Sequence, residues 1–158
     1  MIFLRANNFV DKMPAYLVYS RCLFNNGSQK EAIVKACEVL KQVGIKIDPF
    51  ASKRKALIRI LLLKRRMKNI DDSFFNGSVE LKSIDQETFN MLSIVAEIAY
   101  EWKRPTLFLL SGIAAMEYGL QIGQFNSMGL MMYGMIHAKL GKLDEAILFS
   151  EKVMECKA

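Results

Sequence analysis

The chain has 158 residues, enough for a single domain that buries about 70% of the surface of its unfolded chain. Hydrophobic residues make up 52% of it and only 3 residues are proline and 9 glycine, so the composition excludes a disordered or low-complexity protein. The formal net charge of +6 comes from one short segment, because the rest of the chain is slightly acidic.

The N-terminal part predicts a short leading segment followed by two helices. Residues 1–13 are expected to be the tail of a preceding element, and they lack the apolar core and cleavage site of a signal peptide. The first helix is expected to begin at Pro14, which the first turn of a helix tolerates. Ser28 followed by Glu31 predicts a capping box that starts a second helix, lasting to about Val43.

A pattern in these two helices recurs 114 residues later. Each copy has a small residue seven positions before a glycine, and a Glu-Ala-Ile triplet that begins four positions after it. Two antiparallel helices need small residues at their closest approach and a glycine that takes a positive φ between them. We therefore expect two terminal helical hairpins, in which Ser20 faces Ala32 and Gly134 faces Ala146.

The excess positive charge lies in a helix predicted over residues 52–69, with its first serine as the N-cap. Eight basic and no acidic residues lie in Lys53–Lys68, and the rest of the chain has 14 basic and 16 acidic residues. At about 100° per residue, the basic side chains surround most of this helix and leave only the arc near Ile60, Leu63 and Met67. This distribution favours solvated side chains that cover the helix flanks. The alternatives are that these side chains contact an acidic partner surface, nucleic acid or anionic lipid.

The remaining chain predicts one loop and four more helices. Residues 70–83 lack an apolar period and are expected to form the loop, after which Asp85 caps the next helix. Residues 105–138 contain a single formal charge, but glycines and polar residues interrupt them, so two buried helices are expected rather than a membrane span. The helices expected in this part cover residues 85–102, 105–121, 127–139 and 143–156.

The order of elements predicts an all-α fold. No Val, Ile and Thr-rich segment alternates with period two between turn signals, as a strand would. We predict a right-handed array of antiparallel helical hairpins with about seven helices, in which each hairpin buries one face against the next. The array is expected to form one helical-repeat domain over residues 14–158.

The residues with reactive side chains favour structural roles. The cysteines form no CxxC pair, which disfavours a metal site, and free thiols are expected at Cys22, Cys37 and Cys156. His137 is expected to be a packed or half-buried ring rather than a catalytic group. Turn and cap roles are expected for Asp71, Asp72 and Asp85. We expect the methionines of the helix at residues 127–139 to fill the core, and these are Met128, Met131, Met132 and Met135. The alternative is that they form an adaptable peptide-binding surface.

A set of structural motifs is similar to those of a known family. They are Gly44-Ile45-Lys46-Ile47 with Pro49, Leu92 through Ala99-Tyr100 with Pro105-Thr106-Leu107-Phe108, Met116-Glu117-Tyr118-Gly119, and Ser127, Tyr133-Gly134, Gly141, Ala146 and Phe149. From Ala15 onward the chain resembles the degenerate tetratricopeptide-like (TPR-like) helical-repeat region of multidomain AAA-ATPase signalling proteins, which can precede kinase, histidine-kinase or cyclase domains. The resemblance implies a TPR-like α-solenoid. The chain has no GxxxxGK[ST], HRD or DFG motif, so the activity of such a protein would lie outside this chain.

These observations predict a non-catalytic protein-interaction or scaffold module, a fragment or relative of a multidomain signalling ATPase or kinase, in the cytoplasm. No catalytic, cofactor-binding or metal site is expected, because no nucleophile with a base, paired carboxylates or metal cluster can be named. The residues expected to contact an acidic partner or a neighbouring domain are Lys53, Arg54, Lys64, Arg65, Arg66 and Lys68. The alternative is a small basic protein that binds nucleic acid or an acidic surface through the same helix.

Overall fold

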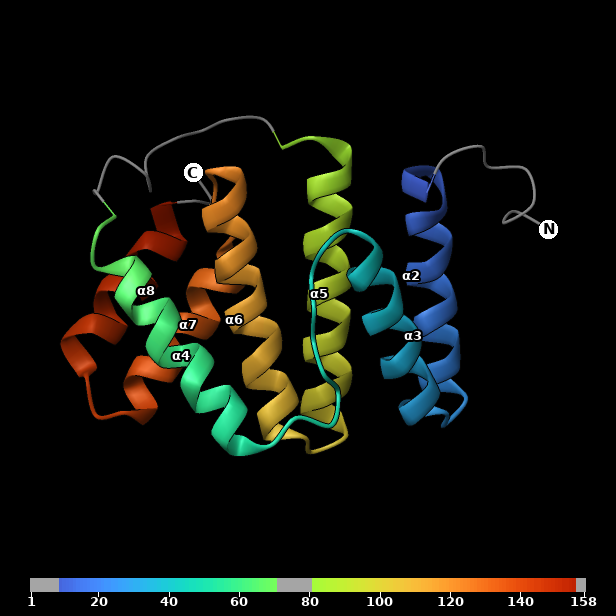
Figure 1. The fold of residues 1–158 in the computed structure, drawn as a ribbon, viewed down its shortest axis with the longest axis horizontal. Helices are drawn as coiled ribbons and strands as arrows, with labels where there is room; N and C mark the ends of the chain where they lie inside the picture. Colours follow the sequence, from blue (N-terminus) through green and yellow to red (C-terminus); the bar gives the residue numbers. More distant parts are fainter. Residues whose placement is uncertain (1–8, 71–80, 156–158) are drawn as a thin grey trace. The chain divides into compact units, whose positions relative to one another are not determined.

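The computed structural model describes residues 9–70 and 81–155, and these residues form seven α-helices and no strand (Figure 1). The helices are α2 Phe9–Asn25, α3 Gln29–Gln42, α4 Lys53–Met67, α5 Ser83–Glu101, α6 Pro105–Ile122, α7 Ser127–Lys139 and α8 Leu143–Glu155. The predicted all-α class is therefore confirmed for the described residues. The right-handed arrangement of antiparallel hairpins stays a prediction.

The chain divides into two compact units and crosses between them at three points, the last of which lies inside α6, between Phe108 and Leu109. Among the described residues, the first unit contains α2, α3, α5 and the first turn of α6. The second unit contains α4, the rest of α6, α7 and α8. The prediction of one repeat domain over residues 14–158 stays a prediction.

Helix α2 begins earlier than the sequence predicts. It starts at Phe9, so Pro14 lies inside the helix instead of in its first turn, and residues 9–13 are not a separate segment. The proline is tolerated because it lies close to the helix start, where its missing N–H removes a single bond to the carbonyl of Val10. The rings of Phe9 and Tyr16 lie 6.3 Å apart between centroids, and this contact helps to hold the additional turns.

Of the predicted helix caps, Ser28 is confirmed in position only and Asp85 is wrong. Ser28 occupies the N-cap of α3, but its side chain makes no capping hydrogen bond, because its φ of −89° and ψ of 51° lie outside the extended region in which a serine reaches the helix amides. Helix α5 begins at Ser83, so Asp85 lies in its first turn, where its amide donates to the carbonyl of Lys82 at 2.9 Å. The carboxylate of Asp85 still favours the positive end of the helix. The predicted cap at Ser52 is confirmed, since its hydroxyl accepts from the amide of Lys55 at 3.4 Å.

In the first unit, α2, α3 and α5 pack against one another. Gly27 takes the predicted positive φ of 81° in the turn between α2 and α3, where the amide of Ser28 donates to the carbonyl of Leu23 at 2.9 Å. Ser20 and Ala32 are both fully buried, as the expected helix pairing requires. The core of the unit contains Met13, Ile33, Leu40, Phe89 and Leu92.

In the second unit, glycines mark the closest approaches between helices. A Cβ atom added to Gly134 of α7 would lie 3.3 Å from the Cβ atom of Phe149 and 3.4 Å from the carbonyl oxygen of Ala146 in α8. The predicted approach of Gly134 to Ala146 is therefore confirmed. A Cβ atom added to Gly112 of α6 would lie 2.7 Å from the Cβ atom of Met132 in α7, so these two helices also pack at a glycine.

The methionines of α7 do not share one environment. Met132 is buried against Gly112, which confirms core filling at this position. Met131 and Met135 are 49% and 41% exposed, and Met128 is half-buried. Core filling is therefore wrong for Met131 and Met135, because α7 buries the side that carries residues such as Leu130 and Tyr133 and leaves these two side chains exposed to solvent.

Candidate functional site

Helix α4 combines a buried aliphatic stripe with an excess of positive charge. Ala56, Ile60 and Leu63 are its buried residues, and they confirm the arc that the sequence leaves without basic side chains. Basic residues occupy both its first and its last turn, and the first turn has no acidic residue. Positive charge near the N-terminus of a helix opposes the helix dipole and costs about 0.3–1 kcal/mol per charge. The stability of the helix therefore does not account for the basic residues at its start.

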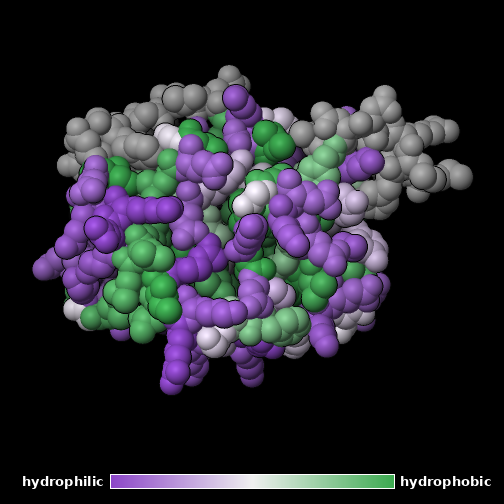
Figure 2. Space-filling model, viewed as in Figure 1, coloured by the Kyte–Doolittle hydropathy of each residue, from purple (hydrophilic) through white to green (hydrophobic). Residues whose placement is uncertain are grey.

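The side of α4 that faces solvent is also aliphatic, which the sequence analysis missed. Four of its side chains are 52–59% exposed, namely Leu57, Ile58, Leu61 and Leu62. Arg54 and Arg65 are exposed four residues before Ile58 and four residues after Leu61. At helical spacing these six residues share one side of the helix, and we refer to them together as the α4 face. Figure 2 shows hydrophobic atoms beside hydrophilic ones where Figure 1 places α4.

The predicted contact residues of α4 fall into two groups. Among the residues that the structure describes, Arg54 and Arg65 have no ion-pair partner. In the described part of the chain, an ion-pair partner is also absent at three further exposed residues, Lys53, Arg66 and Lys68. Lys64 is only half-exposed and lies beside Lys142 and Glu145, so it belongs to a local charge cluster.

A basic residue outside the predicted set is also neutralised within the second unit. The guanidinium of Arg59 forms an ion pair with the carboxylate of Glu117 in α6, and both side chains are partly buried. Arg59 therefore holds α4 against α6. This pairing leaves the positive charge of α4 concentrated on its exposed side.

The C-terminal end of α7 holds a cluster of aromatic and charged side chains. The ring of His137 is 3% exposed and lies 4.6 Å from the ring of Tyr133 and 5.6 Å from that of Phe149, between centroids. This confirms the predicted packed histidine. Its Nδ1 atom approaches the carboxylate of Glu145, but the contact does not have hydrogen-bond geometry. Lys142 donates to the same carboxylate at 2.9 Å, and this bond lowers the pKa of Glu145.

Burial makes His137 a source of pH dependence. Loss of solvation lowers the pKa of His137, and the nearby charge of Glu145 only partly opposes this effect. The unfolded chain then binds a proton more readily than the folded chain, so the free energy of unfolding falls as the pH drops below the ordinary histidine pKa of about 6.5. We expect urea unfolding between pH 7.5 and 5 to show this loss.

Because His137 is the sole histidine, a single substitution isolates its effect. A His137→Phe variant keeps an aromatic ring against Tyr133 and Phe149 but cannot titrate, so its stability should depend less steeply on pH over the same interval. Carboxylates other than Glu145, which contacts the ring, contribute equally in both proteins and cancel in the comparison. Equal slopes for the two proteins would show that the folded chain does not hold His137 in its neutral form.

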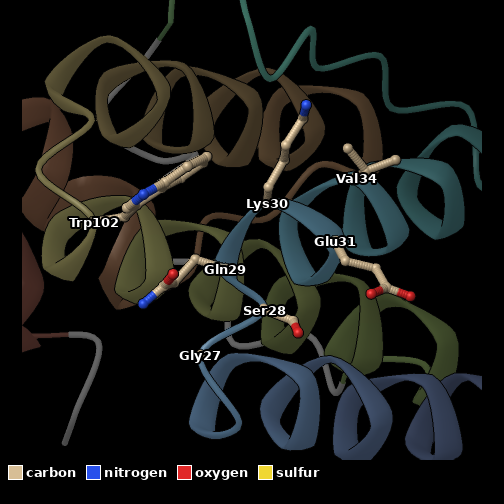
Figure 3. Close-up of a pocket in the computed structure, with 7 residues that line it drawn as sticks. All are labelled: Gly27, Ser28, Gln29, Lys30, Glu31, Val34 and Trp102. Carbon is tan, nitrogen blue, oxygen red and sulfur yellow. The ribbon is translucent and has the colours of Figure 1, made fainter.

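A shallow hollow of about 470 Å³ lies at the N-terminal end of α3 (Figure 3). It is lined by Gly27, Ser28, Gln29, Lys30, Glu31, Val34 and Trp102. Next to it, the guanidinium of Arg104 lies 5.6 Å from the ring centroid of Phe50 and 5.0 Å from that of Trp102. The amides of a helix start attract anions, but Glu31 opposes them here. We therefore assign no ligand to this hollow.

The cysteines and the predicted cap and turn residues form no metal site in the part of the chain that is described. No group of three or more His, Cys, Asp or Glu residues in residues 9–70 and 81–155 is placed to hold a metal ion. Cys22 is exposed and Cys37 is buried, and both are free thiols. Burial raises the pKa of Cys37 to about 12, which keeps it protonated. Cys156, Asp71 and Asp72 lie outside the described residues.

No helix of the described residues has both the length and the apolar character needed to cross a membrane. The chain matches no protein-family model, no curated protein and no solved structure. The resemblance to the TPR-like region of AAA-ATPase signalling proteins therefore stays a prediction.

Proposed function

We propose that the chain is a non-catalytic protein-interaction module that binds an amphipathic helix with acidic flanks on the α4 face. The observation that carries the proposal is the exposure of four adjacent aliphatic side chains by more than half, between Arg54 and Arg65. Clustered exposed aliphatic side chains favour a protein contact, and arginine is enriched at the anchor points of such contacts. A helical partner suits this surface because its apolar side chains recur at the same spacing.

The charge of α4 decides the chemistry of the partner. All charged side chains of Lys53–Met67 are positive, and the two arginines of the α4 face, Arg54 and Arg65, have no ion-pair partner among the described residues. A partner helix with Asp or Glu beside its apolar stripe is attracted to this surface, whereas a basic helix is repelled. The acidic flanks therefore supply specificity and the aliphatic side chains supply most of the contact area.

The same helix is poorly suited to nucleic acid. Its sequence contains no aromatic side chain for stacking on bases, and no Asn or Gln for reading base edges. The centre of its exposed side is aliphatic, so a phosphate backbone would lie over four side chains that gain nothing from it. These features favour a protein partner over the nucleic acid alternative.

A titration with defined probes tests the proposal. The probe is a fluorescent synthetic helix with leucines at positions i, i+4, i+7 and i+11 and flanking glutamates, and its counterpart has lysines in place of the glutamates. We expect the acidic probe to bind with a Kd on the order of micromolar. An Arg54→Glu, Arg65→Glu variant should weaken this binding at least about tenfold, because both rim charges then repel the probe.

A second variant controls for net charge. Lys41→Glu with Lys139→Glu changes the charge by the same amount at exposed positions outside α4, so it should leave the affinity for the acidic probe within about twofold. Equal binding of the acidic and the basic probe would contradict the proposal. Tight binding of a 20-base-pair duplex that is lost in the Arg54→Glu, Arg65→Glu variant would support the nucleic acid alternative instead.

The setting of the module belongs to the same proposal. Free thiols at Cys22 and Cys37 are typical of a reducing compartment, which supports a cytoplasmic location. A place in a multidomain signalling protein rests on the resemblance alone. The titration does not depend on either point.

A further inference from the structure

We infer that the α4 face binds α8 of a second copy of this chain, so that copies associate head to tail. This inference rests on the proposed function and names its partner. It starts from a second unpartnered helix surface, which the sequence analysis did not use.

Helix α8 exposes an apolar stripe at the spacing of a helix-packing seam. Leu143, Ile147 and Met154 are 57–70% exposed and occupy positions i, i+4 and i+11. Position i+7 is Ser150, whose hydroxyl donates to the carbonyl of Ala146 at 2.9 Å. The serine is small and its hydrogen bond is already made, so another helix can pack over it at little cost. We refer to these four residues as the α8 seam.

The α8 seam has an acidic flank along one side. Asp144 and Glu151 are exposed, and each follows a seam residue by one position. Over its length α8 contains four acidic residues and one basic residue, the reverse of α4. The seam therefore has the chemistry that the α4 face requires in its partner.

The two surfaces also match in length. The seam runs from Leu143 to Met154 and the α4 face from Arg54 to Arg65, and the end residues are eleven positions apart in each case. At 1.5 Å per residue both extend over about 16 Å. Leu57, Ile58, Leu61 and Leu62 lie between the two arginines, so apolar side chains meet apolar side chains while the charges meet at the rim.

Charge selects this pairing over the two symmetric ones. An antiparallel pair of α8 helices places Asp144 and Glu151 of one copy against the same flank of the other copy, and like charges oppose it. A pair of α4 helices brings arginines together in the same way. The contact between α4 and α8 is the combination with opposite charges, and it is heterologous, since different surfaces of the two copies meet.

A heterologous contact leaves one free surface at each end of a dimer, so association continues to larger species unless a ring closes. Sedimentation velocity over about 1–100 μM tests this. We expect the weight-average sedimentation coefficient of the native chain to rise with concentration over this range, because two short helix faces give a contact at the low end of stable interface sizes.

Two blocked variants give the decisive result. One has Leu61→Asp and Leu62→Asp on α4, and the other has Ile147→Asp and Met154→Asp on α8. Each alone should stay monomeric, but a mixture should form a 1:1 dimer and nothing larger, because one intact α8 seam meets one intact α4 face. Leu61→Ser with Leu62→Ser, and Ile147→Ser with Met154→Ser, provide milder versions if the aspartates disturb folding.

An exposed aliphatic residue outside the seam supplies the matched control. Leu148 of α8 is 47% exposed, and Leu148→Asp should leave self-association unchanged. A native chain that stays monomeric at 100 μM would overturn the inference, as would native association with no dimer in the mixture of blocked variants. Binding of the acidic probe without self-association would overturn the second copy as partner and leave the proposed function standing. Self-association that persists in both blocked variants would place the contact elsewhere and overturn the inference.

Discussion

Replacement of Tyr133 by alanine should lower the free energy of unfolding by about 3–5 kcal/mol, the range found when a buried aromatic ring is removed. Tyr133 is 2% exposed, and its ring lies 4.6 Å from that of His137 and 4.8 Å from that of Phe149, between centroids. Burial raises the pKa of its hydroxyl to about 12. The alanine variant leaves a cavity where α7 and α8 meet, and urea unfolding followed by circular dichroism measures the loss.

Two further variants test whether the loss of stability comes from the buried ring of Tyr133. One removes only its hydroxyl, and the other removes an exposed tyrosine elsewhere. Tyr133→Phe keeps the ring and its contacts, so it should cost much less than the alanine variant. Tyr100 is 72% exposed, and Tyr100→Ala should change stability by less than about 1 kcal/mol. If Tyr133→Ala costs no more than Tyr100→Ala, the aromatic cluster of Tyr133, His137 and Phe149 does not hold α7 to α8.

Replacement of Gly134 by leucine should cost about 1–3 kcal/mol through overpacking. Even a Cβ atom at this position lies 3.3 Å from the Cβ atom of Phe149 and 3.4 Å from the carbonyl oxygen of Ala146, so the rest of a leucine has no room unless α8 moves. Gly134→Ala should be close to neutral, because the gain of about 1 kcal/mol in helix propensity offsets the tight contact. Thermal unfolding of both variants tests the pairing.

A leucine on the exposed side of α7 controls for the added bulk. Ala138 is exposed one turn after Gly134, so Ala138→Leu introduces the same side chain at a position that is open to solvent. Its melting temperature should remain within a few degrees of the native value. An unchanged melting temperature for Gly134→Leu would mean that α7 and α8 do not approach each other at this glycine.

The positions of the helices were largely predictable from the sequence. Apolar periodicity and the turn residues place the helices expected over residues 105–121 and 127–139 within one residue of α6 and α7. Gly27 and Gly141 take the predicted positive φ values, 81° and 74°, because a turn that short requires a residue without a Cβ atom. Caps were predicted less well. Ser28 has the right residue type but the wrong backbone angles, which a sequence does not specify.

The candidate contact residues were predicted in part. The sequence identifies the positive charge of Lys53–Lys68 because a count of charges needs no structure. It does not separate Arg59, which pairs with Glu117, from Arg54 and Arg65, which have no such partner in the described part of the chain. Arg59 and Glu117 are 58 residues apart, and no local pattern links them.

The sequence by itself determined that this protein is helical, where most of its helices lie and which glycine lets α7 approach α8, because these features follow from local periodicity and backbone freedom. The tertiary structure decided that only one of the two aliphatic sides of α4 is buried. Ala56, Ile60 and Leu63 face the core, and Leu57 and Leu61 face solvent, although both sets have helical spacing. The arc without basic side chains favours burial of the first set, but the sequence does not say whether another helix also covers the second set. The neighbouring helices cover the side of Ala56, Ile60 and Leu63. The side of Leu57 and Leu61 remains exposed as the candidate docking surface.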